Sequence, residues 1–261
     1  MSLHTPKPWD AVASGYAETT AGITAVFSQQ ALDWLAAGPQ DHILDLATGP
    51  GTLARLAAPG VARVSAVDFS PEMLRICRRQ VAGLNVDVLE MDGQDLPFED
   101  QFDAAFSMFG LVFFPDRLAG LRSMRRALRP GAWGCISSWL PPQRSTGMIQ
   151  AMGAVSAALP DWHPGQTERA VWDNPEILRQ AFEDSGFSDI EVEERQMFVE
   201  GDVTPERAWR AIAQGFAPLA LARQTMAHDA WQAAEERGLA WLAGNSESSQ
   251  SYLALLVRGR A

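Results

Sequence analysis

The stretch DLATGPGT, residues 45–52, ends a short apolar run and precedes a segment with a helical pattern. Two glycines, Gly49 and Gly51, flank a proline in it. Glycine removes the side chain where a backbone must approach a ligand or adopt a positive φ, and the start of a helix offers free N–H groups to an anion. With Ala54 as its last member, the segment fits the dinucleotide fingerprint G-x-G-x-x-G/A. It equally fits the glycine loop of an adenosyl-sulfonium binder, or a plain turn with a helix cap.

Composition narrows the class of protein. The chain has 261 residues, of which 47% are hydrophobic and 20% charged, and a net charge of -11. These values are typical of a globular protein and argue against binding long nucleic acids. Cys77 and Cys135 are too few for a metal cluster and are expected to be small buried side chains. The start MSLHTPKPWD lacks the pattern of a signal peptide, and the longest apolar runs are too short to span a membrane. We therefore expect a cytoplasmic protein.

Strand-like and helix-like segments alternate between residues 42 and 140. Ser70-Pro71-Glu72 predicts a helix start, with Ser as the N-cap and Pro at the first helical position. A second helical stripe, 118–128, is expected to end at the RPG of residues 129–131. This alternation predicts a parallel sheet with right-handed crossovers. The predicted strands are 42–46, 63–67, 86–91, 102–108, 132–139, 190–199 and 251–258. The fold class is thus α/β, a Rossmann-like seven-stranded, mostly parallel sheet sandwiched by helices.

The rhythm changes after residue 141, which suggests a division of the chain. Residues 1–40 are expected to form an N-terminal helical entry segment. Residues 41–142, 173–203 and 244–261 are expected to form the Rossmann-like domain. Residues 143–172 and 204–243 are expected to be helical insertions that cap a substrate.

Three carboxylates bear on the identity of the ligand, since ligands on open α/β sheets bind at the carboxyl ends of the strands. Asp68 ends the second strand, where a carboxylate can accept both hydroxyls of a ribose. Asp92-Gly93, followed by Gln94, ends the third strand, where a carboxylate can accept an adenine amino group. Asp45 lies inside the first strand, where dinucleotide folds have apolar residues, and it needs a cationic or hydrogen-bonding partner. Together they favour an adenosyl-sulfonium ligand over a dinucleotide.

At this point the sequence resembles the class I S-adenosylmethionine-dependent methyltransferases, in particular the small-molecule branch that includes ubiquinone and sterol methylating enzymes. The resemblance rests on four stretches between residues 42 and 139: ILDLATGPGTLA, VSAVDFSPEML, VLEMDGQDLPFEDQFDAAFSMFGLVFF and LRSMRRALRPGAWGCISSW. The N-terminal WDAVASGYAE is similar to the family's entry helix.

The resemblance implies S-adenosyl-L-methionine as the cofactor and a role for each matching residue. It implies that the loop backbone and Tyr16 approach the methionyl part, that Asp68 holds the ribose, and that Ser107 lies against the cofactor. Phe69 and Met73 would flank the adenine, whose amino edge Asp92 and Gly93 would read. The predicted cofactor residues are Tyr16, Asp45, Ala47, Thr48, Gly49, Gly51, Asp68, Phe69, Met73, Asp92, Gly93, Gln94 and Ser107. Ala47 departs from the family, which usually has Gly there, and its methyl group disfavours a positive φ.

Methyl transfer from a sulfonium mainly requires alignment, and an O or N acceptor also needs a base. His163, in the loop PDWHPG, is the candidate base, with His228 and Asp161 as further choices; His4 is expected in a mobile tail. Aromatic residues after the fourth strand and in the insertions suggest a flat or apolar small-molecule acceptor. They are Phe109, Phe113, Phe114, Trp139, Trp162, Trp172, Trp209 and Phe216. No nucleic-acid or membrane partner is expected. Two alternatives stay open: an NAD-dependent oxidoreductase, and a non-methylating relative that binds S-adenosylmethionine.

Overall fold

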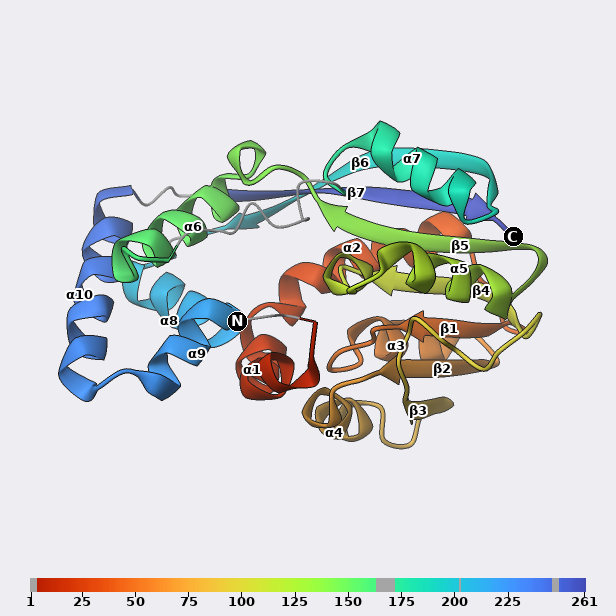
Figure 1. Cartoon of the computed structure of the whole chain (residues 1–261), viewed down its shortest axis with the longest axis horizontal. Helices are drawn as coiled ribbons and strands as arrows, with labels where there is room; N and C mark the ends of the chain where they lie inside the picture. Colours follow the sequence, from red (N-terminus) through yellow and green to blue (C-terminus); the bar gives the residue numbers. More distant parts are fainter. Residues whose placement is uncertain (1–3, 163–171, 202, 246–248) are drawn as a thin grey trace.

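A single sheet organises the chain in the computed structural model, which describes residues 4–162, 172–201, 203–245 and 249–261. The sheet has seven strands in the order β3-β2-β1-β4-β5-β7-β6, with helices on both faces (Figure 1). Strands β1 to β5 run parallel to one another, and β7 is antiparallel to both β5 and β6. The strands are β1 (His42–Leu46), β2 (Arg63–Asp68), β3 (Val86–Glu90), β4 (Phe102–Met108), β5 (Leu128–Trp139), β6 (Ser188–Glu200) and β7 (Ser249–Arg260). The predicted seven-stranded, mostly parallel α/β fold is confirmed.

The helices fall into two groups. Those associated with the sheet are α1 (Pro6–Thr19), α2 (Ala21–Leu35), α3 (Thr52–Ala57), α4 (Pro71–Gln80), α5 (Arg117–Ala127) and α7 (Pro175–Asp184). Those of the two insertions are α6 (Thr146–Ala158), α8 (Pro205–Gly215), α9 (Ala217–Thr225) and α10 (His228–Asn245). Local sequence explains several starts. The Ser70 hydroxyl accepts a hydrogen bond from the Met73 N–H at 3.2 Å, as the Ser-Pro-Glu signal predicts.

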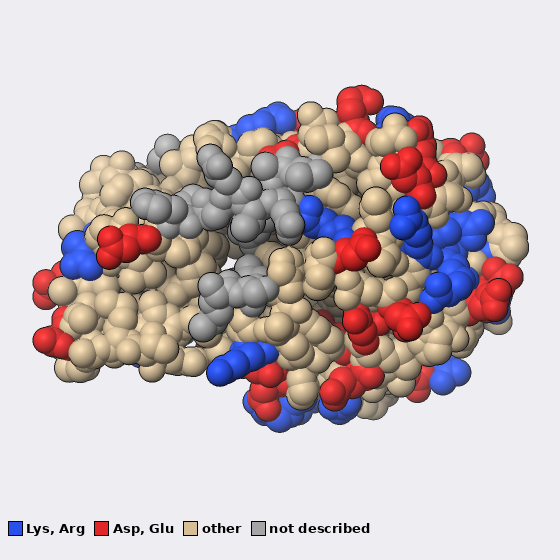
Figure 2. Space-filling view, in the orientation of Figure 1, with Lys and Arg blue, Asp and Glu red and all other residues tan. Residues whose placement is uncertain are grey.

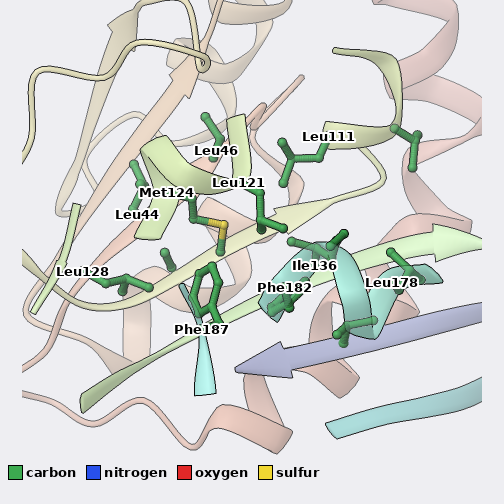
Figure 3. Close-up of a cluster of buried hydrophobic side chains, with 14 of the residues drawn as sticks. Leu44, Leu46, Leu111, Leu121, Met124, Leu128, Ile136, Leu178, Phe182 and Phe187 are labelled. Atoms are coloured by element: carbon green, nitrogen blue, oxygen red, sulfur yellow. The ribbon is translucent and has the colours of Figure 1, made fainter. Parts of the chain in front are cut away.

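Apolar side chains cover both faces of the sheet. On one face, residues of β1, β4 and β5 pack against α5 and α7, with Leu44, Met124 and Phe182 at the centre (Figure 3). On the other face, Ile43, Phe106 and Cys135 pack against α2 and α3. Cys77 and Cys135 are both buried free thiols, as expected. Burial on both faces is what a parallel sheet requires.

The fifth strand begins earlier than the sequence predicts. β5 starts at Leu128, which pairs with Phe102, so α5 ends at Ala127 and the segment 129–131 lies inside the strand. The register shift between Phe102 and Ala104 absorbs these residues. A proline is tolerated in a strand at such an irregularity, which is why the RPG signal was wrongly interpreted as the boundary between helix and strand.

The insertions form a helical body at the end of the sheet where α1 lies (Figure 1). The predicted helical insertion 204–243 consists of three helices, α8 to α10, which enclose an apolar core with α6. Trp209 is buried in this core, where its indole N–H donates to Glu235 Oε1 at 2.7 Å. On the face shown in Figure 2, charges of both signs alternate over the half that holds the sheet, and the helical body shows mostly uncharged side chains.

Candidate active site

A cavity of about 1030 Å³, counted out to its open mouth, lies where β1 to β4 end. Its walls come from residues 4–28 and from the segments that contain or follow these four strand ends. Every predicted cofactor residue except Gly51 and Ser107 lines it: Tyr16, Asp45, Ala47, Thr48, Gly49, Asp68, Phe69, Met73, Asp92, Gly93 and Gln94. The fold therefore brings residues from four separate segments to one site.

Every second residue of the loop after β1 has a backbone conformation in the left-handed region. Ala47, Gly49 and Gly51 have φ values of 58°, 57° and 88°. For a non-glycine residue such a conformation costs about 1–3 kcal/mol, so Ala47 adopts the very conformation that its methyl group disfavours. Gly110 leaves the space for that methyl group, because a Cβ on Gly110 would lie only 2.3 Å from the Ala47 Cβ.

Asp45 finds its partner in the loop that follows it. Its Oδ2 accepts a hydrogen bond from the Thr48 hydroxyl at 2.5 Å and another from the Ala54 N–H at 3.0 Å. Ala54 lies in the first turn of α3, whose N-cap is Gly51 and therefore supplies no side-chain oxygen. The Asp45 carboxylate thus caps α3 from within β1. Burial raises the pKa of Asp45 to about 7, against the effect of both hydrogen bonds.

The raised pKa of Asp45 predicts a pH dependence of stability. Its folded value lies above the ordinary 3.9, so the folded chain retains a proton that the unfolded chain releases between about pH 4 and pH 7. The stabilisation of the folded chain by this proton on Asp45 is complete below about pH 4 and is lost as pH rises through 7. Asp45→Asn keeps an acceptor oxygen but cannot ionise. We expect the free energy of unfolding of Asp45→Asn, relative to the native chain, to rise by roughly 1–3 kcal/mol between about pH 5 and pH 7.5.

Urea denaturation of both proteins across this pH range measures the difference. Asp95→Asn is the matched control, since the Asp95 side chain is 95% exposed. Parallel stability curves for the native chain and Asp45→Asn would contradict the assignment.

Asp68 connects the loop after β1 to the start of α4. Its Oδ2 accepts from the Gly49 N–H at 2.8 Å, and its Oδ1 accepts from the Ser70 N–H at 2.9 Å. The side chain is only 7% exposed, and burial raises its pKa to about 6. Each carboxylate oxygen can accept more than one hydrogen bond. Asp68 can therefore hold the loop and the start of α4 while it accepts hydrogen bonds from a ligand.

The segment after β3 has an internal network. Asp92 Oδ1 accepts from the Gln94 N–H at 2.9 Å and from its amide nitrogen at 3.1 Å. The Gln94 side-chain oxygen in turn accepts from the Asp116 N–H at 2.9 Å. Gly93 is buried between them, where an added Cβ would lie 2.6 Å from the Phe114 ring. Glycine is needed here for close packing, and the network holds Asp92 at the cavity wall.

The first helix closes the cavity on the side away from the sheet. Asp10 Oδ1 accepts from the Ser70 hydroxyl at 2.6 Å and from the Glu72 N–H at 3.2 Å, so α1 is attached to the start of α4. Tyr16, one turn and a half further along α1, lines the cavity and hydrogen-bonds to Thr24. Burial raises the pKa of Tyr16 to about 12, which makes its hydroxyl a hydrogen-bond donor rather than a base at neutral pH.

Two predicted cofactor residues lie behind the cavity wall. Gly51 is the N-cap of α3 and packs against Cys77, whose sulfur would be 2.7 Å from an added Cβ. Ser107 is fully buried on β4, and its hydroxyl has no hydrogen-bond partner in the described part of the chain. Neither lines the cavity, so both lie inside its wall and not on the surface that a ligand would contact.

Neither of the two candidate bases that the structure describes, His228 and Asp161, lies at the cavity. His163 lies outside the described residues. His228 and Asp161 are exposed and do not line the cavity. His4, expected in a tail, instead lines the cavity, and its Nδ1 lies 2.9 Å from the carbonyl oxygen of Phe113. Within the described ranges, no group of side chains is arranged to hold a metal.

Several lining residues were missed by sequence reasoning. Thr24 and Ser28 of α2 face the cavity, and no sequence motif singled them out. Trp9 also lines it, in a T-shaped contact with Phe113 at 4.7 Å between ring centroids. Trp9 lies in the stretch WDAVASGYAE, whose similarity to the family's entry helix could have identified it as a lining residue. Of the aromatic residues considered for the acceptor, Phe109, Phe113 and Phe114 line the cavity.

The described residues of the helical insertions pack beside the N-terminal helix and outside the cavity lining. None of their described residues lines the cavity, whereas Val12 and Ala13 of α1 pack with Ala217 and Ala220 of α9. The described part of the insertions therefore supports α1, the helix that covers the cavity and is called the N-terminal cover below. Their role as a substrate cap stays a prediction. No helix in the described ranges has the length and apolarity to cross a membrane.

Comparison with known proteins agrees with this geometry. Residues 43–131 match the model of a family described as a methyltransferase domain. The chain is 40% identical over 122 residues to the demethylmenaquinone methyltransferase of Thermus thermophilus, over 44% of this chain and 55% of that protein. It is 37% identical over 123 residues to the 2-phytyl-1,4-naphtoquinone methyltransferase of Synechococcus elongatus, over 44% and 53%.

A solved structure extends the likeness to most of the fold. The YcgJ protein from Bacillus subtilis superposes with a TM-score of 0.59 at 15% identity, over 89% of this chain and 97% of that one. At this identity the likeness establishes the fold alone. The chain spans 38% to 55% of the length of the curated relatives it matches. Residues 43–131 are thus similar to a methyltransferase domain, and the fold that contains them is Rossmann-like.

Proposed function

We propose that this protein transfers a methyl group from S-adenosyl-L-methionine to an O or N atom of a small aromatic or hydrophobic metabolite. One observation carries the proposal: a single cavity gathers the glycine loop after β1, Asp68 at the end of β2 and Asp92-Gly93 after β3. The matched methyltransferase domain covers the same segments. A cytoplasmic location remains part of the proposal.

The residues present fit this cofactor. Asp68 and Asp92 offer carboxylate oxygens to hydroxyl and amino groups, and Gly49 leaves the loop backbone open to close approach. When bound, the cofactor supplies a methyl group activated by a sulfonium. The protein's task is then to position the acceptor and to exclude water, and positioning can lower a barrier by roughly 7–11 kcal/mol. Trp9, Tyr16 and Phe113 shield the cavity for that purpose.

The capping of α3 disfavours the dinucleotide alternative. Dinucleotide-binding folds place a pyrophosphate at the N terminus of the helix after β1. Here the Ala54 N–H of that turn donates to the Asp45 carboxylate. A pyrophosphate at this helix start would have to compete with the Asp45 side chain for this N–H group. A sulfonium is a cation and does not compete for this donor.

Thermal unfolding with S-adenosylhomocysteine and with NAD tests the cofactor. A ligand at about 100 times its Kd stabilises the folded state by about 2.7 kcal/mol. We expect the midpoint of unfolding to rise with S-adenosylhomocysteine and to stay unchanged with NAD at the same concentration. Stabilisation by NAD alone would overturn the proposal.

Transfer itself needs a second measurement. The native chain, incubated with methyl-labelled S-adenosylmethionine and a panel of phenols, quinols and amines, is expected to label at least one acceptor. The aromatic lining at Trp9, Phe109 and Phe113 favours the ring-containing members. Binding of the cofactor without transfer to any acceptor would favour the non-methylating alternative.

A further inference from the structure

Phe109 occupies the end of the cavity away from the nucleoside-binding carboxylates. The sheet order is β3-β2-β1-β4 at this edge. Asp92 follows β3, Asp68 ends β2 and the glycine loop follows β1, so a cofactor held by all three extends from β3 toward β1. β4 lies beyond β1, and Phe109 is the first residue after it. Under the proposed function, the acceptor end of the cavity is therefore the β4 end.

The backbone of Phe109 is held in an unfavourable conformation. Its φ is 59°, a value rare for a bulky residue. Its N–H donates to the buried Ser137 hydroxyl of β5 at 2.9 Å, which helps to hold the conformation. Glycine would adopt this conformation without strain. The chain instead carries an aromatic ring there, which indicates that the ring has a function that glycine could not supply.

The ring separates the cavity from an aromatic cluster. Phe109 lines the cavity and is 4% exposed. Its ring stacks on Trp139, with ring centroids 4.0 Å apart and planes 19° apart. Phe27 of α2 meets both rings edge-on, at 5.6 Å and 5.7 Å. Neither Trp139 nor Phe27 lines the cavity. Removal of the Phe109 ring would therefore expose a flat apolar surface, the face of Trp139, to the acceptor end.

We propose that Phe109 sets the size limit for the methyl acceptor, by filling a position in which a second aromatic ring would otherwise stack on Trp139. The proposal deepens the proposed function and rests on it for the placement of the acceptor. It assigns to Phe109 a specificity role that does not require the residue to take part in proton transfer. The native chain is thus built for a single ring at this end, and a shortened residue 109 admits two fused rings.

Graded probes test the size limit. Phenol and 2-naphthol are titrated into the native chain, Phe109→Ala and Phe109→Leu by calorimetry, each with and without saturating S-adenosylhomocysteine. We expect the native chain to prefer phenol. In Phe109→Ala the ratio of the 2-naphthol Kd to the phenol Kd should fall at least tenfold, and in Phe109→Leu it should fall by a smaller factor. Phe109→Leu keeps most of the buried apolar volume and serves where Phe109→Ala fails to fold.

Phe198→Ala is the matched control, since it removes the same ring from an exposed phenylalanine that does not line the cavity. Its Kd ratio should stay within threefold of the native value. An equal fall in Phe109→Ala and Phe198→Ala, or none in any residue-109 variant, would overturn the size limit. Failure of the native chain to bind S-adenosylhomocysteine would instead overturn the proposed function. The two failures are distinguishable, because the ratio of the probe Kd values is also measured without S-adenosylhomocysteine.

Discussion

Binding of S-adenosylhomocysteine is expected to weaken at least tenfold, about 1.4 kcal/mol, when Asp68 is replaced by alanine. The substitution removes the carboxylate proposed for the ribose. It also leaves the Gly49 and Ser70 N–H groups without their acceptor, so the loop and the start of α4 lose their common anchor. Hydrogen bonds to charged groups are worth about 1.5–3 kcal/mol each. Isothermal titration at about pH 8, above the pKa of Asp68, measures the affinity.

Asp95→Ala is the control for Asp68→Ala. Asp95 is a carboxylate near the same edge of the sheet, but its side chain is 95% exposed and does not line the cavity. Its affinity should match that of the native chain. A folded Asp68→Ala protein with native affinity would remove Asp68 from the site.

Replacement of Gly15 by alanine is expected to displace the N-terminal cover. An added Cβ would lie 2.1 Å from the backbone oxygen of Gln214 in α8, and backbone cannot move aside as a side-chain end can. Overpacking of this kind costs about 1–3 kcal/mol. Since Trp9 and Tyr16 line the cavity from the same helix, we also expect weaker binding of S-adenosylhomocysteine. Urea denaturation and calorimetry measure the two effects.

Gly22→Ala provides the matched comparison in the neighbouring helix. An added Cβ on Gly22 meets nothing within 4 Å, and alanine in a helix is favoured over glycine by roughly 0.5–1 kcal/mol. Stability should therefore rise slightly and affinity should not change. If Gly15→Ala behaved as Gly22→Ala does, the close contact between α1 and α8 would not control the cover.

Local signals predicted most of the Rossmann-like part. The strand–helix alternation and the Ser70 cap depend on residues within a few positions of each other, so one sequence suffices to interpret them. The boundary at β5 was wrong because Leu128 pairs with Phe102 across the sheet, and this pairing outweighs the Pro-Gly signal.

The site divides in the same way. The glycine loop, Asp68 and Asp92 each directly follow or end a strand, and parallel strands bring such positions to one edge. The partner of Asp45 was open in the sequence, because a carboxylate inside a strand can face a ligand or a neighbouring turn. Only the folded chain shows that it caps α3.

The sequence by itself determined the order of the elements, the fold class and the segments that meet at the strand ends, since these follow from periodicity and turn chemistry. Tertiary structure decided what closes the cavity. Thr24 and Ser28 reach it through the packing of α2 against the sheet. α1 covers it through contacts such as that of Gly15 with Gln214, nearly 200 positions away. Contacts at that separation depend on how whole helices pack, and no local pattern of residues encodes them.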